Sequence, residues 1–186
     1  MSIREISAAA ITDAVEALCI EANTKLPADV KAALDQAEAA EPCPLARETL
    51  GLLQQNLVVA ADKELPICQD TGMACVFIEL GQDAHISGDL TEAVNEGVRR
   101  GYEKAYLRKS ITADPLQRVN TRDNTPAFLT VHLVPGSGCK ITVAPKGAGS
   151  ENMSRLAMLK PADRVEGVKK FVLDTVAEDG ANPCTP

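Results

Sequence analysis

Apolar residues recur every three or four positions through the first sixty residues, which is the spacing of one helical face. One such face is formed by Ile11, Val15, Leu18 and Ala22. A second helix is predicted from Pro27, because proline fits the first helical position. A third is predicted over residues 45–59. The prolines at positions 42 and 44 separate these last two helices, since proline lacks an amide hydrogen.

The pattern changes after Pro66. Residues 67–72 are predicted to form a loop, and residues 73–80 are a continuous apolar run that favours a strand buried on both faces. A long helix is then predicted from Asp89, a residue type that caps helices, with an apolar face that continues to Ala105.

Apolar residues recur at every second position over 127–134 and again over 139–143, which predicts two strands. Because a short Pro-Gly-Ser-Gly turn joins them, we expect a hairpin with one buried face. A glycine-rich loop follows at 146–150, and the last helix is predicted from about Pro161 to a cap at Gly180. Its inward face is expected to carry Val165, Val168, Val172 and Val176.

These elements predict an α+β fold, with amino-terminal helices followed by a mixed or antiparallel sheet flanked by helices. The helical lobe would span about 1–65 and the α+β lobe about 66–186. A chain of 186 residues with 45% hydrophobic composition can bury a sizeable core, and no linker interrupts it. We therefore expect residues 1–186 to form a single domain.

Charge narrows the range of partners. A net charge of −7 gives no attraction to nucleic acid or to an acidic membrane surface. No apolar run approaches the roughly 20 residues of a membrane-spanning helix, and the first residues lack the basic-then-apolar pattern of a signal peptide. A cytoplasmic protein is predicted.

Six cysteines in a reducing compartment indicate metal or reactive chemistry rather than a disulfide scaffold. No Cys-x-x-Cys occurs, so the short spacings of zinc fingers and bacterial ferredoxins are excluded. Free cysteine is commonly a core residue. We expect that structural role for Cys19, Cys43, Cys75 and Cys139.

The segment from Ile67 to Gly72 places a thiol, an amide and a carboxylate in succession before a buried strand. Loops held by such strands often carry functional sites. The residues alone also allow a simpler interpretation, in which Asp70 caps a turn and Cys68 packs. A second thiol, Cys184, lies between prolines, which stiffen a loop, although a cysteine in such a position can simply be exposed.

Arg108 is predicted at the end of the long helix, where a cation complements the helix dipole. Its planar guanidinium would equally suit a substrate carboxylate. The glycine-rich loop lacks the order of a phosphate-binding P-loop. Asp123 and Asn124 are interpreted as turn formers first.

His85 and His132 are interpreted as packing or surface residues rather than catalysts.

Four motifs occur together in one order: Cys68-Gln69-Asp70-Thr71-Gly72, Leu107-Arg108-Lys109-Ser110, the loop 146–150, and the proline-flanked Cys184. In this order they resemble the amino-terminal part of the class I, iron-sulfur fumarate hydratase and L(+)-tartrate dehydratase alpha-subunit family. Two positions depart from the family pattern, Ala148 in the glycine-rich loop and Thr185 after the last cysteine.

The resemblance implies a 4Fe-4S cluster bound by Cys68 and Cys184, with the third cluster cysteine absent from this chain. It implies that Gln69 and Asp70 act in catalysis. It also implies that the substrate is bound by Gln69, Asp70, Arg108, Gly147 and Gly149.

The implied reaction is the reversible dehydration of a 2-hydroxy dicarboxylate, L-malate to fumarate, with L(+)-tartrate dehydration as the alternative. A beta subunit or carboxy-terminal domain is the implied partner, homodimers are expected, and the isolated chain should be inactive. A hypothesis of another class is a non-catalytic subunit that binds carboxylates or zinc.

Overall fold

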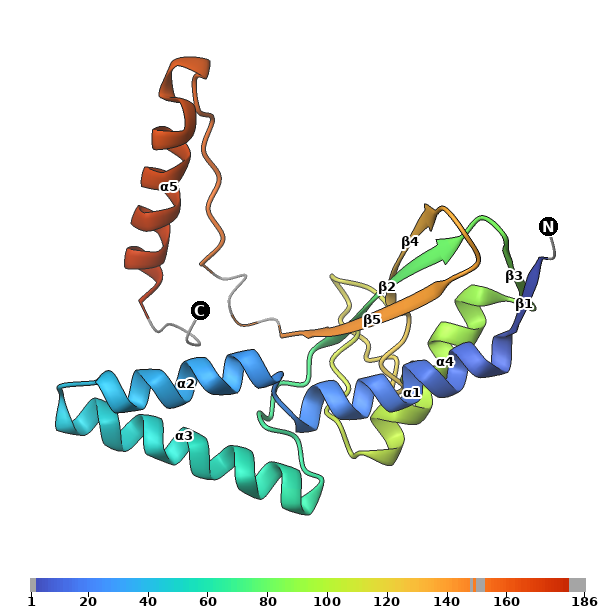
Figure 1. Cartoon of the computed structure of the whole chain (residues 1–186), viewed down its shortest axis with the longest axis horizontal. Coiled ribbons are helices and arrows are strands. Elements are labelled where there is room, and N and C mark those ends of the chain that lie inside the picture. The colour runs from blue at the N-terminus through green and yellow to red at the C-terminus, as the bar shows by residue number, and fades with distance from the viewer. Residues whose placement is uncertain (1–2, 148, 150–152, 181–186) are drawn as a thin grey trace. The chain divides into compact units, whose positions relative to one another are not determined.

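The computed structural model describes residues 3–147, 149 and 153–180. The chain divides into two compact units, 1–146 and 147–186. The elements, shown in Figure 1, are β1 (Arg4–Ser7), α1 (Ala8–Thr24), α2 (Ala28–Ala40), α3 (Pro44–Lys63), β2 (Met73–Gly81), β3 (Ala84–Ser87), α4 (Leu90–Lys104), β4 (Phe128–Val134), β5 (Cys139–Lys146), a 3₁₀ helix (Pro161–Asp163) and α5 (Arg164–Asp179). No described helix is long and apolar enough to span a bilayer.

The core of the first unit lies between one face of a sheet and the helices α1 and α4, which run side by side (Figure 1). The two helices approach closely because Gly97 has no side chain: a Cβ there would lie 2.7 Å from the carbonyl oxygen of Thr12. The fully enclosed apolar and aromatic side chains of this core are Val15, Cys19, Val76, Ile78, Val94, Val98 and Tyr102. The predicted periodicity of α1 and α4 is therefore confirmed.

The main sheet has the strand order β4-β2-β5, with β2 parallel to β4 and antiparallel to β5. The predicted α+β class with a mixed sheet is confirmed, but the predicted hairpin is wrong, because β2 lies between the two strands that were expected to pair. Alternation identifies the faces of a strand and not its neighbours. The longest apolar strand takes the central position, where both of its edges are paired.

The connection between β4 and β5 crosses the end of β2. The amide of Gly81 donates to the carbonyl oxygen of Gly138 at 2.7 Å, and the amide of Asp83 donates to that of Gly136 at 2.9 Å. A Cβ at Gly81 would lie 2.2 Å from the carbonyl oxygen of Gly136. Glycine at position 81 is thus what lets the chain pass this closely.

Burial of β2 differs from the prediction on one face. Ala74, Val76 and Ile78 are enclosed by the helices, whereas Phe77 on the opposite face is 39% exposed. A second sheet, the parallel pair β1 and β3, was not predicted from the sequence. Each of these strands has four residues, too few for a clear alternation.

The helices α2 and α3 form a hairpin outside this core. Helix α2 has no buried residue, and the only buried residue of α3 is Ala60. Pro27 precedes α2 rather than beginning it, since the helix starts at Ala28. Because α1 belongs to the α+β core, the expected helical lobe 1–65 does not stand apart as a whole. That the chain is a single domain stays a prediction.

The second unit contains α5, which ends at Gly180 with φ of 59°, as its predicted cap requires. The valines expected to face inward are instead 49–64% exposed, so the inward prediction is wrong for this chain. No described part of the second unit supplies a buried residue against them. The exposed positions are Val165, Val168, Val172 and Val176.

Candidate active site

The loop 67–72 is fixed at both ends by buried or helical groups. At its start the amide of Ile67 donates to the carbonyl oxygen of Asn23 in α1 at 2.9 Å, and Asn56 Nδ2 donates to the carbonyl oxygen of Ile67 at 2.8 Å. At its end the hydroxyl of Tyr102 donates to the carbonyl oxygen of Thr71 at 2.7 Å. The side chains between these ends are therefore presented by a held backbone.

Cys68 lies exposed in this loop, so the interpretation in which it packs is wrong. Its Sγ accepts the amide hydrogen of Asp70 over a donor–acceptor distance of 3.5 Å. The carboxylate of Asp70 accepts the amide hydrogen of Gly72 at 3.2 Å, which confirms the predicted turn. The same turn thus orients both the thiol and the carboxylate.

Arg108 lies beyond the helix rather than at its end, because α4 stops at Lys104 and Tyr106 turns the chain with φ of 53°. The expectation that it caps the helix dipole is therefore wrong. Its Nη1 donates to Gln69 Oε1 at 3.0 Å, and its carbonyl oxygen accepts the Thr71 hydroxyl at 2.8 Å. Two segments far apart in sequence thus bring an arginine, an amide, a carboxylate and a thiol together.

Asn124 joins the same two segments, although the sequence favours a turn for it over a role in the site. Its side chain is fully buried, and Nδ2 donates to the carbonyl oxygen of Gly72 at 3.1 Å. Its Oδ1 accepts the amides of Ser110 at 2.7 Å and Ile111 at 3.2 Å. The neighbouring Asp123 caps a turn as predicted, accepting the amide of Thr125 at 3.0 Å.

The pKa values of the buried groups indicate which are inert. Burial raises the pKa of the Cys19 thiol to about 12, and burial is also the main cause that raises the pKa of Tyr102. Burial raises the pKa of Cys139 despite the opposing effect of Arg4. A neutral, enclosed thiol is a poor metal ligand and nucleophile.

Cys75 is buried as well, and Cys139 is half-buried against the core, so packing accounts for three of the four cysteines that were expected to be structural. Cys43 is exposed at the start of α3, and packing does not account for it. His85 and His132 are exposed on strands, as expected.

No three His, Cys, Asp or Glu side chains of the described residues gather where they could hold a metal ion. Cys184 lies outside the described residues. Gly147 and Gly149 belong to the second unit. The first unit ends at Lys146, which is paired with Met73 directly after the loop 67–72.

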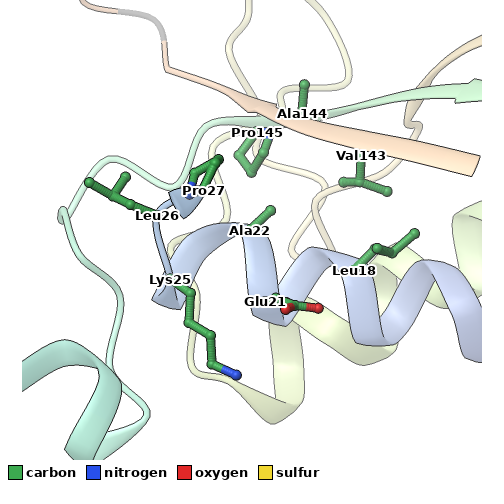
Figure 2. Close-up of a pocket in the computed structure, with 9 residues that line it drawn as sticks. All are labelled: Leu18, Glu21, Ala22, Lys25, Leu26, Pro27, Val143, Ala144 and Pro145. Carbon is green, nitrogen blue, oxygen red and sulfur yellow. The ribbon is translucent and has the colours of Figure 1, made fainter. Parts of the chain in front are cut away.

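Two hollows of the first unit lie away from this loop. One has a volume of about 470 Å³. Figure 2 shows that Leu18 and Ala22 of α1 and Val143 of β5 face one another in it. A larger one of about 850 Å³ lies beside Ile20, Leu65 and Tyr106. Neither is lined by the loop 67–72 or by Arg108.

Comparison with known proteins gives a consistent result. Residues 12–186 match the model of the fumarate hydratase (Fumerase) family. One relative is a protein of Methanocaldococcus jannaschii with the provisional name L(+)-tartrate dehydratase subunit alpha. It is 39% identical over 183 residues, which cover 95% of this chain and 64% of that protein. The L(+)-tartrate dehydratase subunit alpha of Escherichia coli strain UTI89 is 29% identical over 180 residues, covering 95% and 59%. The chain thus spans less than two thirds of the length of these curated relatives.

Proposed function

Since the chain belongs to the fumarate hydratase (Fumerase) family, we propose that it is the cluster-binding part of an iron-sulfur hydro-lyase that interconverts L-malate and fumarate. The observation that carries the proposal is the contact between Arg108 and Gln69, at 3.0 Å, beside the exposed Cys68. Such an arrangement places a cation and an amide within reach of one small anionic molecule.

Arg108 and Gln69 are suited to hold the substrate carboxylates. A guanidinium donates two parallel hydrogen bonds to a carboxylate, and these charge-assisted bonds are shorter and stronger than neutral ones. The carbonyl oxygen of Arg108 is held by Thr71, so the backbone that presents the guanidinium is tied to the loop that presents Gln69. Positioning of this kind lowers the entropy that must be lost in reaching the transition state.

Cys68 fits one corner of a 4Fe-4S cluster. Its thiol is exposed and already accepts an amide hydrogen, and such N–H···S bonds tune cluster sulfurs. When bound, a cluster with one open iron supplies Lewis-acid polarisation of the substrate hydroxyl, which makes hydroxide a better leaving group. Cys184 would be the second ligand, and the third would come from outside this chain.

Asp70 is proposed as the group that steers or protonates the departing hydroxyl, so that the C–O bond breaks with release of water. Its carboxylate is half-buried and oriented by the Gly72 amide. The proton on the adjacent carbon must pass to a base. We propose that this base lies outside these 186 residues.

The complete enzyme is proposed to include a carboxy-terminal portion or beta subunit. The relatives are longer than this chain and are named as alpha subunits. The exposed valines of α5 support the idea, since an apolar stripe of this kind ordinarily faces another part of an assembly. Gly147 and Gly149 would then let the backbone approach the substrate. Homodimers and a cytoplasmic location, where thiols stay reduced, complete the proposal.

L(+)-tartrate is the second candidate substrate, because both relatives described above bear the name tartrate dehydratase. It differs from L-malate by one hydroxyl group. A site with a polar partner for that hydroxyl would reject the molecule that lacks it strongly, since the partner would be left unpaired. The two substrates can therefore be separated by rates.

The test is anaerobic reconstitution of this chain with its complementing portion, followed by rates on L-malate, fumarate and L-tartrate. We expect a brown complex that loses colour and activity in air, and an isolated chain with neither. A colourless complex that binds zinc, or no metal, without hydro-lyase activity would favour the non-catalytic subunit instead.

A further inference from the structure

We propose that Asn124 is the positioning residue that sets the distance between Arg108 and the loop that carries Gln69 and Asp70. The inference rests on the proposed function, because it concerns the same site. Asn124 itself is fully buried and lies behind the exposed groups, so it acts through them rather than on the substrate.

The side-chain amide of Asn124 forms hydrogen bonds through both its nitrogen and its oxygen. Its Nδ2 donates to the carbonyl oxygen of Gly72, the last residue of the loop 67–72. Its Oδ1 accepts two backbone amides, those of Ser110 and Ile111, immediately after the segment that presents Arg108. A carboxamide donates through its nitrogen and accepts through its oxygen, so one side chain can bond to both segments. Asn124 therefore ties together the backbones on which the substrate-binding groups stand.

The other contacts between these segments do not by themselves fix how the two backbones are oriented. Besides the side-chain contact between Arg108 and Gln69, the Thr71 hydroxyl bonds to the Arg108 carbonyl, which fixes one point between the two backbones. The Tyr102 hydroxyl holds only the loop side, at the carbonyl oxygens of Thr71 and Gly72. One point of attachment leaves rotation possible, whereas a second, bifurcated one removes it.

The backbone of Asn124 also favours asparagine. Its φ is 62°, a left-handed conformation that asparagine and glycine adopt more readily than other residues. Glycine at this position would keep the backbone without strain but remove all three hydrogen bonds. Aspartate would keep the shape and the acceptor but lose the donor to Gly72 when ionised. Comparing these two substitutions therefore separates the bond donated to Gly72 from the bonds accepted from Ser110 and Ile111.

The experiment compares Asn124→Asp and Asn124→Gly with Asn120→Asp as the matched control. Asn120 is an exposed asparagine of the same segment, with bonds to the Lys109 carbonyl and the Arg122 amide but none to the loop 67–72. Two quantities are measured: amide hydrogen exchange at Ser110 and Ile111 in the 186-residue chain, and KM and kcat for L-malate in the assembled enzyme.

In Asn124→Gly, exchange at Ser110 and Ile111 should accelerate about ten-fold, the equivalent of one hydrogen bond. In Asn124→Asp the two amides should stay protected, while kcat/KM falls about 100-fold through a higher KM and a lower kcat together. The control should stay within about two-fold in every quantity. A purely structural role would lower the active fraction and leave KM unchanged.

The inference is overturned if the wild-type KM and kcat survive in both Asn124 variants, or if the two amides exchange at the wild-type rate in Asn124→Gly. If the wild-type assembly hydrates no substrate, the proposed function fails. Exchange at Ser110 and Ile111 then still decides whether Asn124 joins the two segments.

Discussion

The guanidinium of Arg108 meets the amide of Gln69 on an exposed surface, so its contribution comes from its shape and charge and not from burial. Replacement by lysine keeps the charge but loses the planar fork that pairs with a carboxylate. We expect Arg108→Lys to raise KM for L-malate by about ten-fold or more, the loss of one charge-assisted hydrogen bond. Steady-state kinetics of the assembled enzyme measure this.

The control for that change is Arg118→Lys, since Arg118 is also an exposed arginine. Its KM should equal that of the unmodified enzyme. Equal KM values in all three proteins would mean that Arg108 does not bind the substrate.

Tyr102 contributes through its hydroxyl, which donates to the carbonyl oxygens of Thr71 and Gly72 from a fully buried position. Tyr102→Phe leaves the ring in place but removes that donor. We expect a loss of about 1–3 kcal/mol in the free energy of unfolding, the cost of unpaired buried polar groups. Urea denaturation measures this loss. The control is Tyr106→Phe, which should change the free energy of unfolding little because Tyr106 is 89% exposed. Equal stabilities would contradict the account.

The sequence identifies the exposed members of the site but not the buried ones. Cys68, Gln69, Asp70 and Arg108 stand in recognisable motifs. Hydrogen bonds join them in two pairs, Asp70 with Cys68 and Arg108 with Gln69. Asn124 follows an aspartate in what looks like an ordinary turn. Its burial depends on how distant segments pack, which a local pattern does not contain.

Among the elements, the contact between α1 and α4 is the most sensitive to volume. Gly97→Ala would place a Cβ 2.7 Å from the Thr12 carbonyl oxygen and 2.7 Å from the Val15 Cβ. We expect it to destabilise the chain by about 1–3 kcal/mol, because overpacking outweighs the gain in helix propensity. Thermal or urea unfolding measures the difference.

The matched substitution is Gly51→Ala in α3, where the nearest group is the flexible carboxylate end of Glu38 at 3.2 Å. Here the helix propensity should prevail, with a gain of about 0.5–1 kcal/mol. Destabilisation by both substitutions to the same degree would contradict the packing described for α1 and α4.

Most helices are predictable because an amphipathic face repeats over many residues, as from Ile11 to Ala22. Pairing of strands is less predictable, since alternation in β4 and β5 gives no information about β2 between them. The short strands β1 and β3 pair over only four residues, and their sequence carries no period. Gly81 is a local sign that the connection between β4 and β5 crosses the end of β2, because a Cβ at this position would clash with Gly136.

At the scale of the whole molecule, much apolar surface is left exposed in each unit. In the first, Phe77 and Phe128 lie on the open side of the sheet, 39% and 63% exposed. In the second, no described residue of the unit covers the valine stripe of α5. The helical spacing of the valines predicts that they share one face of the helix, but it does not say which polypeptide covers that face. Together with the greater length of the relatives, these surfaces support an enzyme completed by further chain.

The central claim is that Cys68 binds the iron-sulfur cluster of the assembled enzyme, and its most direct test is the iron and sulfide content of two serine variants. Cys68 and Cys43 are both exposed, so neither Cys68→Ser nor Cys43→Ser should change folding stability by more than about 0.5 kcal/mol. We expect anaerobically assembled Cys43→Ser to keep the cluster and the hydration of fumarate, while Cys68→Ser loses both. A Cys68→Ser enzyme with the full iron and sulfide content of the wild type would contradict it.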